Sequence, residues 1–299
     1  MNIQILAQKF YDYSLYMRGY RPATIRRYRQ AINLYSRLAE VSEIEQVTEE
    51  NVRQFFFNGR TKRNWKPNSF ICFYHSLTVF FKWCVSEKYL TKNPADDLEI
   101  PKVEKRLPSC LTKQDALKLV EVVYNYPYDY KFLRYRNHAI FSTFLFSGLR
   151  KKELLKLKYT DVDVENLSIF VNQGKGGKDR IIPMCSALAQ SLKRYLDERK
   201  RLNKTCPEFF ASLNRNCGFT DMGLRNLVRK IKETSKINFT IHKLRHTYAT
   251  LMLTGGCDIF SLSRLMGHSD IKTTTIYLSA SAEHLRLQMN KHPLNDLVI

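Results

Sequence analysis

The sequence has 299 residues, enough for two domains that each bury a core of their own. It carries 49 Lys and Arg against 28 Asp and Glu, a net charge of +21, which indicates nucleic acid as the leading partner, with an unspecialised basic surface as the alternative. No apolar run approaches the ~18 residues that span a bilayer, so we expect a cytoplasmic chain with no membrane partner. The seven cysteines form no CxxC pair, which disfavours structural zinc and indicates reduced thiols.

Residues 1–98 are predicted to form a helical domain. Apolar residues recur at helical spacing after Pro22, and similar patterns predict helices after Thr48 and from Phe70 to Phe81. Four helices of this kind make a small bundle. Basic residues lie on the polar side of the helix after Pro22 and in the loop before the last helix. We interpret them as contacts to a phosphate backbone, with an ordinary solvated surface as the alternative: Arg26, Arg27, Arg29, Arg60, Lys62, Arg63 and Lys66.

Residues 99–110 are expected to form an extended linker, because they combine Pro101 and Pro108 with mixed charges and little periodicity. Two basic domains joined in this way could close around a rod, so a clamp on duplex DNA is our hypothesis. Residues 111–299 then form the second domain, whose first helix is predicted to begin at Thr112 as the N-cap.

The first chemical motif of the second domain is GLRKKEL, residues 148–154. An apolar helix from Phe132 to Ser147 is predicted to end at Gly148 and to deliver Arg150 just beyond it. Glu153 follows three residues later, so its carboxylate could hold the guanidinium of Arg150 in place.

The second motif, GKGGKDR at residues 174–180, lies between two β-like runs, Leu167 to Val171 and Arg180 to Pro183. This pattern predicts a hairpin whose turn carries Lys175 and Lys178. Lys178 and Arg180 are also candidates for DNA contacts.

Two amphipathic helices are predicted after the hairpin. The first passes through Leu188 and Leu196, and its basic side, which includes Arg199, is expected to face outward. The second runs from about residue 222 to residue 234, and its Arg225 and Arg229 are candidates for a surface that faces a DNA groove. Ordinary solvated faces explain both basic surfaces equally well.

The last motif occupies residues 239–281. His242 and Arg245 are three residues apart on a predicted helix, so both could reach one anion. His246 is expected to point elsewhere on this helix and to be structural. A second short helix from Ile259 to Met266 precedes a Gly-His turn at His268, and Tyr277 follows nine residues later.

The four motifs GLRKKEL, GKGGKDR, HKLRHTYAT and GHSDIKTTTIY, in this order, resemble the tyrosine recombinase (phage integrase) family, in the layout of Xer-like recombinases and compact mobile-element integrases. The resemblance implies a mixed, mainly α fold: an N-terminal four-helix SAM-like core-binding domain, and an α/β tyrosine-recombinase catalytic domain with a small antiparallel sheet. A chain of this family would be nucleoid-associated.

The resemblance also implies the chemistry of site-specific DNA recombination, in which duplex DNA is cut and rejoined through a 3′-phosphotyrosyl intermediate. Tyr277 would be the nucleophile, and Lys175 the general acid, with Lys178 as the alternative. No cofactor and no metal are required. Relaxation of DNA by a type IB topoisomerase and a catalytically silent DNA-binding regulator are the alternative functions. The implied catalytic residues are Arg150, Lys175, His242, Arg245, His268 and Tyr277, with Glu153 in support.

Double-stranded DNA with a specific recombination site is the implied partner. Four protomers would assemble on two such sites, with residues 282–299 docked on a neighbouring protomer. A second recombinase or an accessory DNA-bending protein would complete the complex. The motifs are common to chromosome-dimer resolution and to the integration, excision or inversion of a mobile element.

Overall fold

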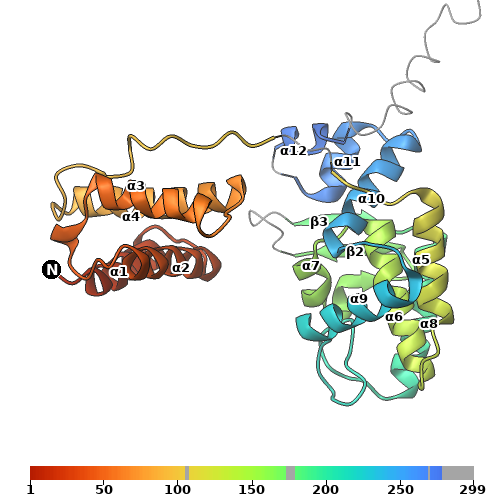
Figure 1. Cartoon of the computed structure of the whole chain (residues 1–299). Helices are drawn as coiled ribbons and strands as arrows, with labels where there is room; N and C mark the ends of the chain where they lie inside the picture. Colours follow the sequence, from red (N-terminus) through yellow and green to blue (C-terminus); the bar gives the residue numbers. More distant parts are fainter. Residues whose placement is uncertain (105–107, 173–178, 269, 278–299) are drawn as a thin grey trace, which may run out of the picture. The chain divides into compact units, whose positions relative to one another are not determined.

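The computed structural model describes residues 1–104, 108–172, 179–268 and 270–277 (Figure 1). The chain folds as two compact units, residues 1–105 and residues 106–299. Each unit has a hydrophobic core of its own. The described residues are mainly helical, as predicted, and include one small antiparallel sheet.

The first unit is a bundle of four α-helices within residues 1–104. Local signals explain where the helices begin: Asn2 and Thr48 accept hydrogen bonds from the first turns of two of them, and Pro22 and Pro67 are the first residues of the other two. Phenylalanine and tyrosine rings fill the core between the helices. The elements are α1 (Ile3–Asp12), a π-helical segment (Tyr13–Met17), α2 (Pro22–Leu38), a 3₁₀ turn (Ile44–Gln46), α3 (Glu49–Thr61) and α4 (Pro67–Ser86).

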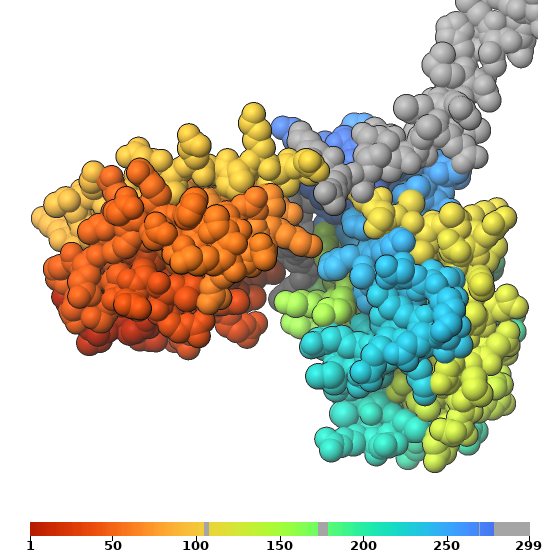
Figure 2. Space-filling model, in the orientation of Figure 1, coloured from red at the N-terminus to blue at the C-terminus, as the bar shows by residue number. Residues whose placement is uncertain are grey.

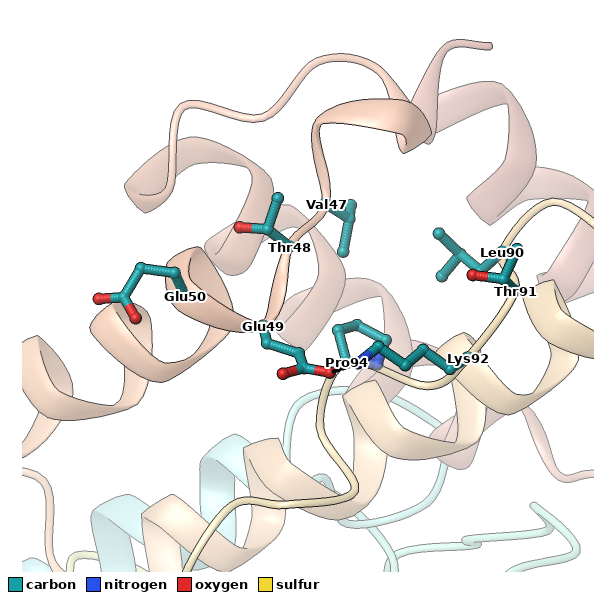
Figure 3. Close-up of a pocket in the computed structure, with 8 residues that line it drawn as sticks. All are labelled: Val47, Thr48, Glu49, Glu50, Leu90, Thr91, Lys92 and Pro94. Carbon is teal, nitrogen blue, oxygen red and sulfur yellow. Dashed lines mark ion pairs between the residues drawn. The ribbon is translucent and has the colours of Figure 1, made fainter.

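An open hollow of about 370 Å³ lies in the first unit where the start of α3 meets the segment after α4 (Figure 3). An ion pair between Glu49 and Lys92 crosses it, and Val47, Leu90 and Pro94 supply its apolar lining. It contains none of the residues expected to be catalytic, so we regard it as a surface feature of the bundle.

The second unit is built around α6 (Lys131–Ser147), which packs against α5 (Lys113–Asn125), α8 (Ser186–Arg201) and α10 (Ile241–Thr254). Because neighbours cover it on several sides, α6 buries most of its residues, including the polar Arg136 and Asn137. In the space-filling view, residues coloured cyan to blue and α5 in yellow form much of the viewed face of this unit (Figure 2). The remaining helices are α7 (Lys151–Lys156), a 3₁₀ turn (Tyr159–Asp161), α9 (Asp221–Ser235), α11 (Ile259–Met266) and α12 (Lys272–Thr275).

The sheet of the second unit has three antiparallel strands in the order β1 (Val162–Asp163), β2 (Ser168–Val171) and β3 (Arg180–Pro183). Strands β2 and β3 pair with Val171 opposite Arg180, so the predicted hairpin is confirmed in its two strands. Its turn, with Lys175 and Lys178, lies outside the described residues. Arg180 therefore marks the base of the turn.

The helices α10, α11 and α12 gather at one end of the second unit (Figure 1). Thr240 and Asp258 cap α10 and α11, and Gly267 ends α11 in the left-handed conformation. The bounds of α11 are those predicted. A small apolar cluster holds these helices together and includes Tyr248, Leu262 and Tyr277. Three segments of the last motif, residues 239–281, thus pack together.

Candidate active site

Arg150 lies at the junction between α6 and α7, as the N-cap of α7. Gly148, two residues earlier, has φ +60°, and a Cβ there would stand 2.3 Å from Cδ1 of Tyr248, so only glycine fits this turn. The Arg150 guanidinium donates to Glu153 Oε1 at 2.7 Å and to the Gly267 carbonyl at 2.9 Å. A sharp turn and two acceptors therefore fix the direction of this side chain.

Arg245 on α10 is 6% exposed and connects three segments. It donates to the carbonyl of Gly148, to that of Met266 at 2.7 Å, and it lies 3.1 Å from His268 Nε2. Burial, followed by the positive charge of Arg150, lowers the pKa of Arg245 to about 10, so the guanidinium is still charged at neutral pH. These hydrogen bonds and the nearby charge of Glu153 offset the cost of burying the guanidinium.

Three arginines meet the C-terminal end of α11 at consecutive carbonyls. Arg180 Nε donates to Leu265 O at 2.9 Å, next to the carbonyl contacts of Arg245 at Met266 and of Arg150 at Gly267. The last carbonyls of a helix have no partners within the helix and carry its negative dipole end, which favours cations. The end of α11 thus gathers guanidinium groups from α10, from the start of α7 and from β3.

Glu153 is the carboxylate of this cluster. It accepts from the backbone N–H of Arg150 at 2.8 Å, and from Arg180 at 2.9 and 3.2 Å. Burial alone would raise the pKa of Glu153, but the hydrogen bonds from Arg180 and Arg150 outweigh it and lower the pKa to about 2. One carboxylate thus faces Arg150, Arg180 and, nearby, Arg245, which leaves the cluster positively charged.

Arg180 differs from its predicted place as a DNA contact. Its side chain is only 9% exposed, and all of its contacts point inward, to Glu153 and to Leu265 O. Gly267 makes room for it, because a Cβ there would stand 2.8 Å from Arg180 Nη1. We therefore assign Arg180 to the internal support of the cluster.

Tyr277 follows α12 and is 2% exposed. Its backbone N–H donates to Thr274 O at 3.0 Å, and the Thr274 hydroxyl lies 2.7 Å from Nδ1 of His268. Burial raises the pKa of Tyr277, while the charges of Arg245 and Arg150 oppose this shift. The phenol therefore lies within electrostatic reach of both arginines of the same chain.

His246 lies against the phenol, contrary to the prediction that it points elsewhere. Its Nδ1 is 2.8 Å from the Tyr277 hydroxyl, and the two ring centroids are 5.6 Å apart. The signal was its spacing: four residues after His242 is one helical turn, so both imidazoles follow one side of α10. His242 itself is exposed on the first turn of α10.

The structure thus brings together Arg150, Arg245, His268 and Tyr277, with His242 one turn before His246 on α10. Lys175 and Lys178 lie outside the described residues. Sequence reasoning missed the inward places of Arg180 and His246, since only tertiary structure shows which neighbours a side chain meets.

The other basic residues predicted to bind DNA are exposed. In the first unit Arg29 lies over the ring of Tyr11, with 5.0 Å from its Cζ to the ring centroid, and Arg60 donates to the carbonyl of Trp65. On α9, Arg225 pairs with Asp221 at 2.5 Å. The exposed set comprises Arg26, Arg27, Arg29, Arg60, Lys62, Arg63, Lys66, Arg225 and Arg229.

Arg199 on α8 was predicted to face outward with its basic neighbours, and this was wrong. It is 3% exposed and donates to several carbonyls of the chain after α8, among them Lys204 O at 3.1 Å and Glu208 O at 2.5 Å. The orphan carbonyls of a loop there outweigh the cost of burying a guanidinium.

Within the described ranges, no group of three or more His, Cys, Asp or Glu side chains could hold a metal ion. In the same part of the chain, no helix combines the length and the apolar character needed to cross a membrane.

Residues 109–284 match the phage integrase family, and residues 6–91 match the phage integrase N-terminal SAM-like domain. The chain belongs to the phage integrase family of tyrosine recombinases. This recombinase is 30% identical to the tyrosine recombinase XerC of Oceanobacillus iheyensis over 302 residues, covering 97% of both chains. It is 35% identical to XerA of Pyrococcus horikoshii over 207 residues, 69% of this chain and 68% of that one.

Solved structures agree with this fold for the recombinase. The XerA recombinase is 26% identical with a TM-score of 0.54, over 97% of this chain and 99% of that one. A λ integrase (75–356) dimer bound to a COC′ core site gives a TM-score of 0.72 at 23% identity, over 91% and 97% of the two chains. The Tn1549 transposon integrase in complex with transposon right end DNA gives 0.75 at 20% identity, over 97% and 99%. The predicted fold class is confirmed.

Proposed function

We propose that the recombinase cuts duplex DNA with the Tyr277 hydroxyl as nucleophile and rejoins it after strand exchange. The observation that supports this role is the position of the phenol in one buried cluster with Arg245, Arg150 and His268 of the same chain. A phenol with its ordinary pKa of about 10 attacks poorly at neutral pH, so it needs adjacent positive charge or a base. This cluster supplies the charge.

The guanidinium groups would bind the scissile phosphate. In phosphoryl transfer the attacking and leaving oxygens are roughly in line, and negative charge is spread over the non-bridging oxygens. Arg150 and Arg245 would hold these oxygens, since arginine keeps its charge and its fork matches them. His242 would donate a further hydrogen bond, and His268, which faces Arg245 and Thr274, would help to position Tyr277. Donors already fixed before the reaction stabilise the transition state at little reorganisation cost.

The leaving group is the 5′ oxygen of the cut strand. We assign its protonation to Lys175, with Lys178 as the alternative on the same turn. Arg180, which follows this turn in the sequence, is anchored to Glu153 and Leu265 O beside the cluster. Tyr277 would then carry the 3′ phosphate, and the strand would end in a free 5′ hydroxyl.

Rejoining would follow the same path in reverse. The phosphotyrosyl bond retains the energy of the phosphodiester, so the 5′ hydroxyl of a second strand can attack it without ATP. When the attacking hydroxyl belongs to a different strand from the one that was cut, the product is recombinant DNA. Recombination between two sites calls for four protomers, and we assign residues 282–299 to the contact between neighbours.

The exposed basic residues would hold the duplex. Arg26, Arg27 and Arg29 on α2 and the residues near the end of α3 would contact phosphates, which position DNA without reading its sequence. Arg225 and Arg229 on α9 would do the same from the second unit. A partner recombinase or a DNA-bending protein remains part of this proposal.

Covalent capture tests the nucleophile. A pool of nicked duplexes with a randomised core is incubated with the wild-type chain, and DNA that stays attached in detergent is amplified into a suicide substrate. The wild-type chain should form an adduct, with the DNA mapped by mass spectrometry to Tyr277, and Tyr277→Phe should form none. An adduct on another residue, or one that persists in Tyr277→Phe, would overturn the assignment. Binding without an adduct would favour a silent DNA-binding regulator.

Strand transfer separates the two enzymatic functions. With the captured sequence placed in two labelled duplexes, a recombinase joins strands of different duplexes. Relaxation of a supercoiled plasmid without such joint products would favour the type IB topoisomerase alternative.

A further inference from the structure

The hydroxyl of Tyr277 has one imidazole directly against it. His246 Nδ1 lies 2.8 Å from the phenol oxygen, within hydrogen-bond distance. Neither partner is free to turn away easily, because Tyr277 is 2% exposed and its backbone is tied to Thr274. His246 is fixed by its place in the middle of α10. Packing and backbone contacts therefore hold His246 and Tyr277 next to each other.

Other groups near the phenol are poorly placed to take its proton. Glu153 is occupied by Arg150 and Arg180, and its pKa of about 2 makes it a weak base. His268 directs Nε2 to Arg245 and Nδ1 to Thr274. Among the described residues, His246 is the basic group that lies within hydrogen-bond distance of the phenol oxygen.

The surroundings of His246 favour its neutral form. Burial lowers the pKa of His246, and the neighbouring His242 and Arg245 on the same helix lower it further. Tyr277 faces it from beyond α12, and Arg150 acts on that phenol from the start of α7. A neutral imidazole that bears its hydrogen on Nε2 presents a lone pair at Nδ1, which can accept the Tyr277 O–H.

We propose that His246 is the proton acceptor for the Tyr277 nucleophile. As the phenol oxygen forms its bond to phosphorus and the bond from phosphorus to the 5′ oxygen breaks, the phenol proton moves to His246 Nδ1. The general acid assigned above gives a proton to the 5′ oxygen. On rejoining, the imidazolium returns its proton to the phenol oxygen, so no proton is gained or lost over a full cycle. The proposal rests on the role given to Tyr277.

Two substitutions separate proton transfer from simple orientation. His246→Asn places an amide near the position of Nδ1, so it can still hold the hydroxyl but cannot take the proton. His246→Ala removes the ring and leaves space for free imidazole. We expect both to slow adduct formation by roughly 10²–10⁴-fold on the captured suicide duplex, the usual contribution of a general base. We expect added imidazole to restore His246→Ala but not His246→Asn.

The pH profile gives a second readout. Wild-type cleavage should fall as the pH drops through the lowered pKa of His246, because a protonated Nδ1 has no lone pair to offer. The comparison is with His246→Asn, which keeps His242 and His268 and should lack this limb. A rate for His246→Asn within about threefold of wild type, smaller than any general-base contribution, would overturn the proposal. So would a loss in His246→Ala that imidazole does not reduce.

A third measurement needs no DNA. Nitrogen-15 NMR of the full wild-type chain labelled at histidine should show His246 as the Nε2–H tautomer at neutral pH. A hydrogen on Nδ1 would contradict the proposal. This test does not depend on whether the variants fold. An absence of any wild-type adduct would overturn the proposed function and this inference together. A wild-type adduct with an undiminished His246→Asn rate would overturn this inference alone.

Discussion

Two sets of basic residues in this molecule differ in burial: one is covered and hydrogen-bonded, and the other is exposed. In the second unit Arg150, Arg180 and Arg245 are largely covered, and each guanidinium donates to named acceptors. In the first unit Arg26, Lys62 and their neighbours are exposed on helix surfaces and loops. Hydrogen bonds thus fix the direction of each guanidinium in the covered set.

The difference follows from the cost of burying charge. A buried guanidinium must be paired or hydrogen-bonded, so the fold supplies Glu153 and the carbonyls at the end of α11. Those contacts hold the groups in place for chemistry on one phosphate. An exposed cation needs no such partner and can follow a phosphate backbone of any sequence. Substitutions in the covered set should therefore lower stability or the reaction rate, whereas those in the exposed set should lower DNA affinity.

The largest expected effect is on stability, from Glu153→Gln. The change leaves Arg180 and Arg150 without their carboxylate, and removal of one partner from a buried ion pair costs about 3–5 kcal/mol of unfolding free energy. Urea unfolding measures it. The control is Glu165→Gln, whose ion pair with Lys193 is exposed and should contribute about 0–1 kcal/mol. Equal losses in the two variants would contradict the role of the cluster.

The same carboxylate should make stability depend on pH. The pKa of Glu153 is lowered in the folded chain from its ordinary 4.5 to about 2. The stabilisation is therefore full above the ordinary value and is lost as the pH falls toward 2. Unfolding measured across this range should show a steeper acid decline for the wild type than for Glu153→Gln, and parallel curves would count against this.

Arg245→Lys should affect catalysis most strongly among conservative changes. A lysine ammonium cannot reproduce the fork that contacts the carbonyls of Gly148 and Met266 while it faces a phosphate. Loss of one such donor typically costs roughly 10²–10³ in rate, to be measured as adduct formation on the suicide duplex. The matched change Arg201→Lys, on an exposed residue paired with Glu198, should leave the rate near that of wild type. Similar rates for Arg245→Lys and Arg201→Lys would contradict the prediction.

Much of this site could be predicted from the sequence because its motifs are local. The spacing of His242 and Arg245 and the Gly-Leu-Arg turn each describe one element, and the structure has those elements. The places of Arg180 and Arg199 could not be read in this way, since a basic residue on an amphipathic pattern looks exposed until a loop carbonyl or a buried carboxylate faces it. The contact between His246 and Tyr277 likewise depends on how α12 packs on α10.

Gly148→Ala tests the turn that carries Arg150. A left-handed backbone costs a residue with a Cβ about 1–2 kcal/mol, and here the Cβ would also displace Tyr248, 2.3 Å away. Gly256→Ala is the control, because Gly256 has φ +90° with nothing within 4 Å of an added Cβ. Gly148→Ala should lose more stability in urea than Gly256→Ala, and it should also slow adduct formation because the Gly148 carbonyl accepts from Arg245. A smaller loss for Gly148→Ala would mean that Tyr248 does not limit this turn.

The smallest effect is expected in the exposed set, from Lys62→Gln. Lys62 is exposed at the end of α3, so stability should change by no more than about 0.5 kcal/mol. If Lys62 contacts a phosphate, affinity should fall similarly for every duplex, and the slope of log affinity against log salt should shrink by about 0.9. Lys118→Gln, an exposed residue of α5 outside the predicted DNA contacts, removes the same charge. Because both variants have the same net charge, equal salt slopes would show that Lys62 acts only through the overall charge of the chain.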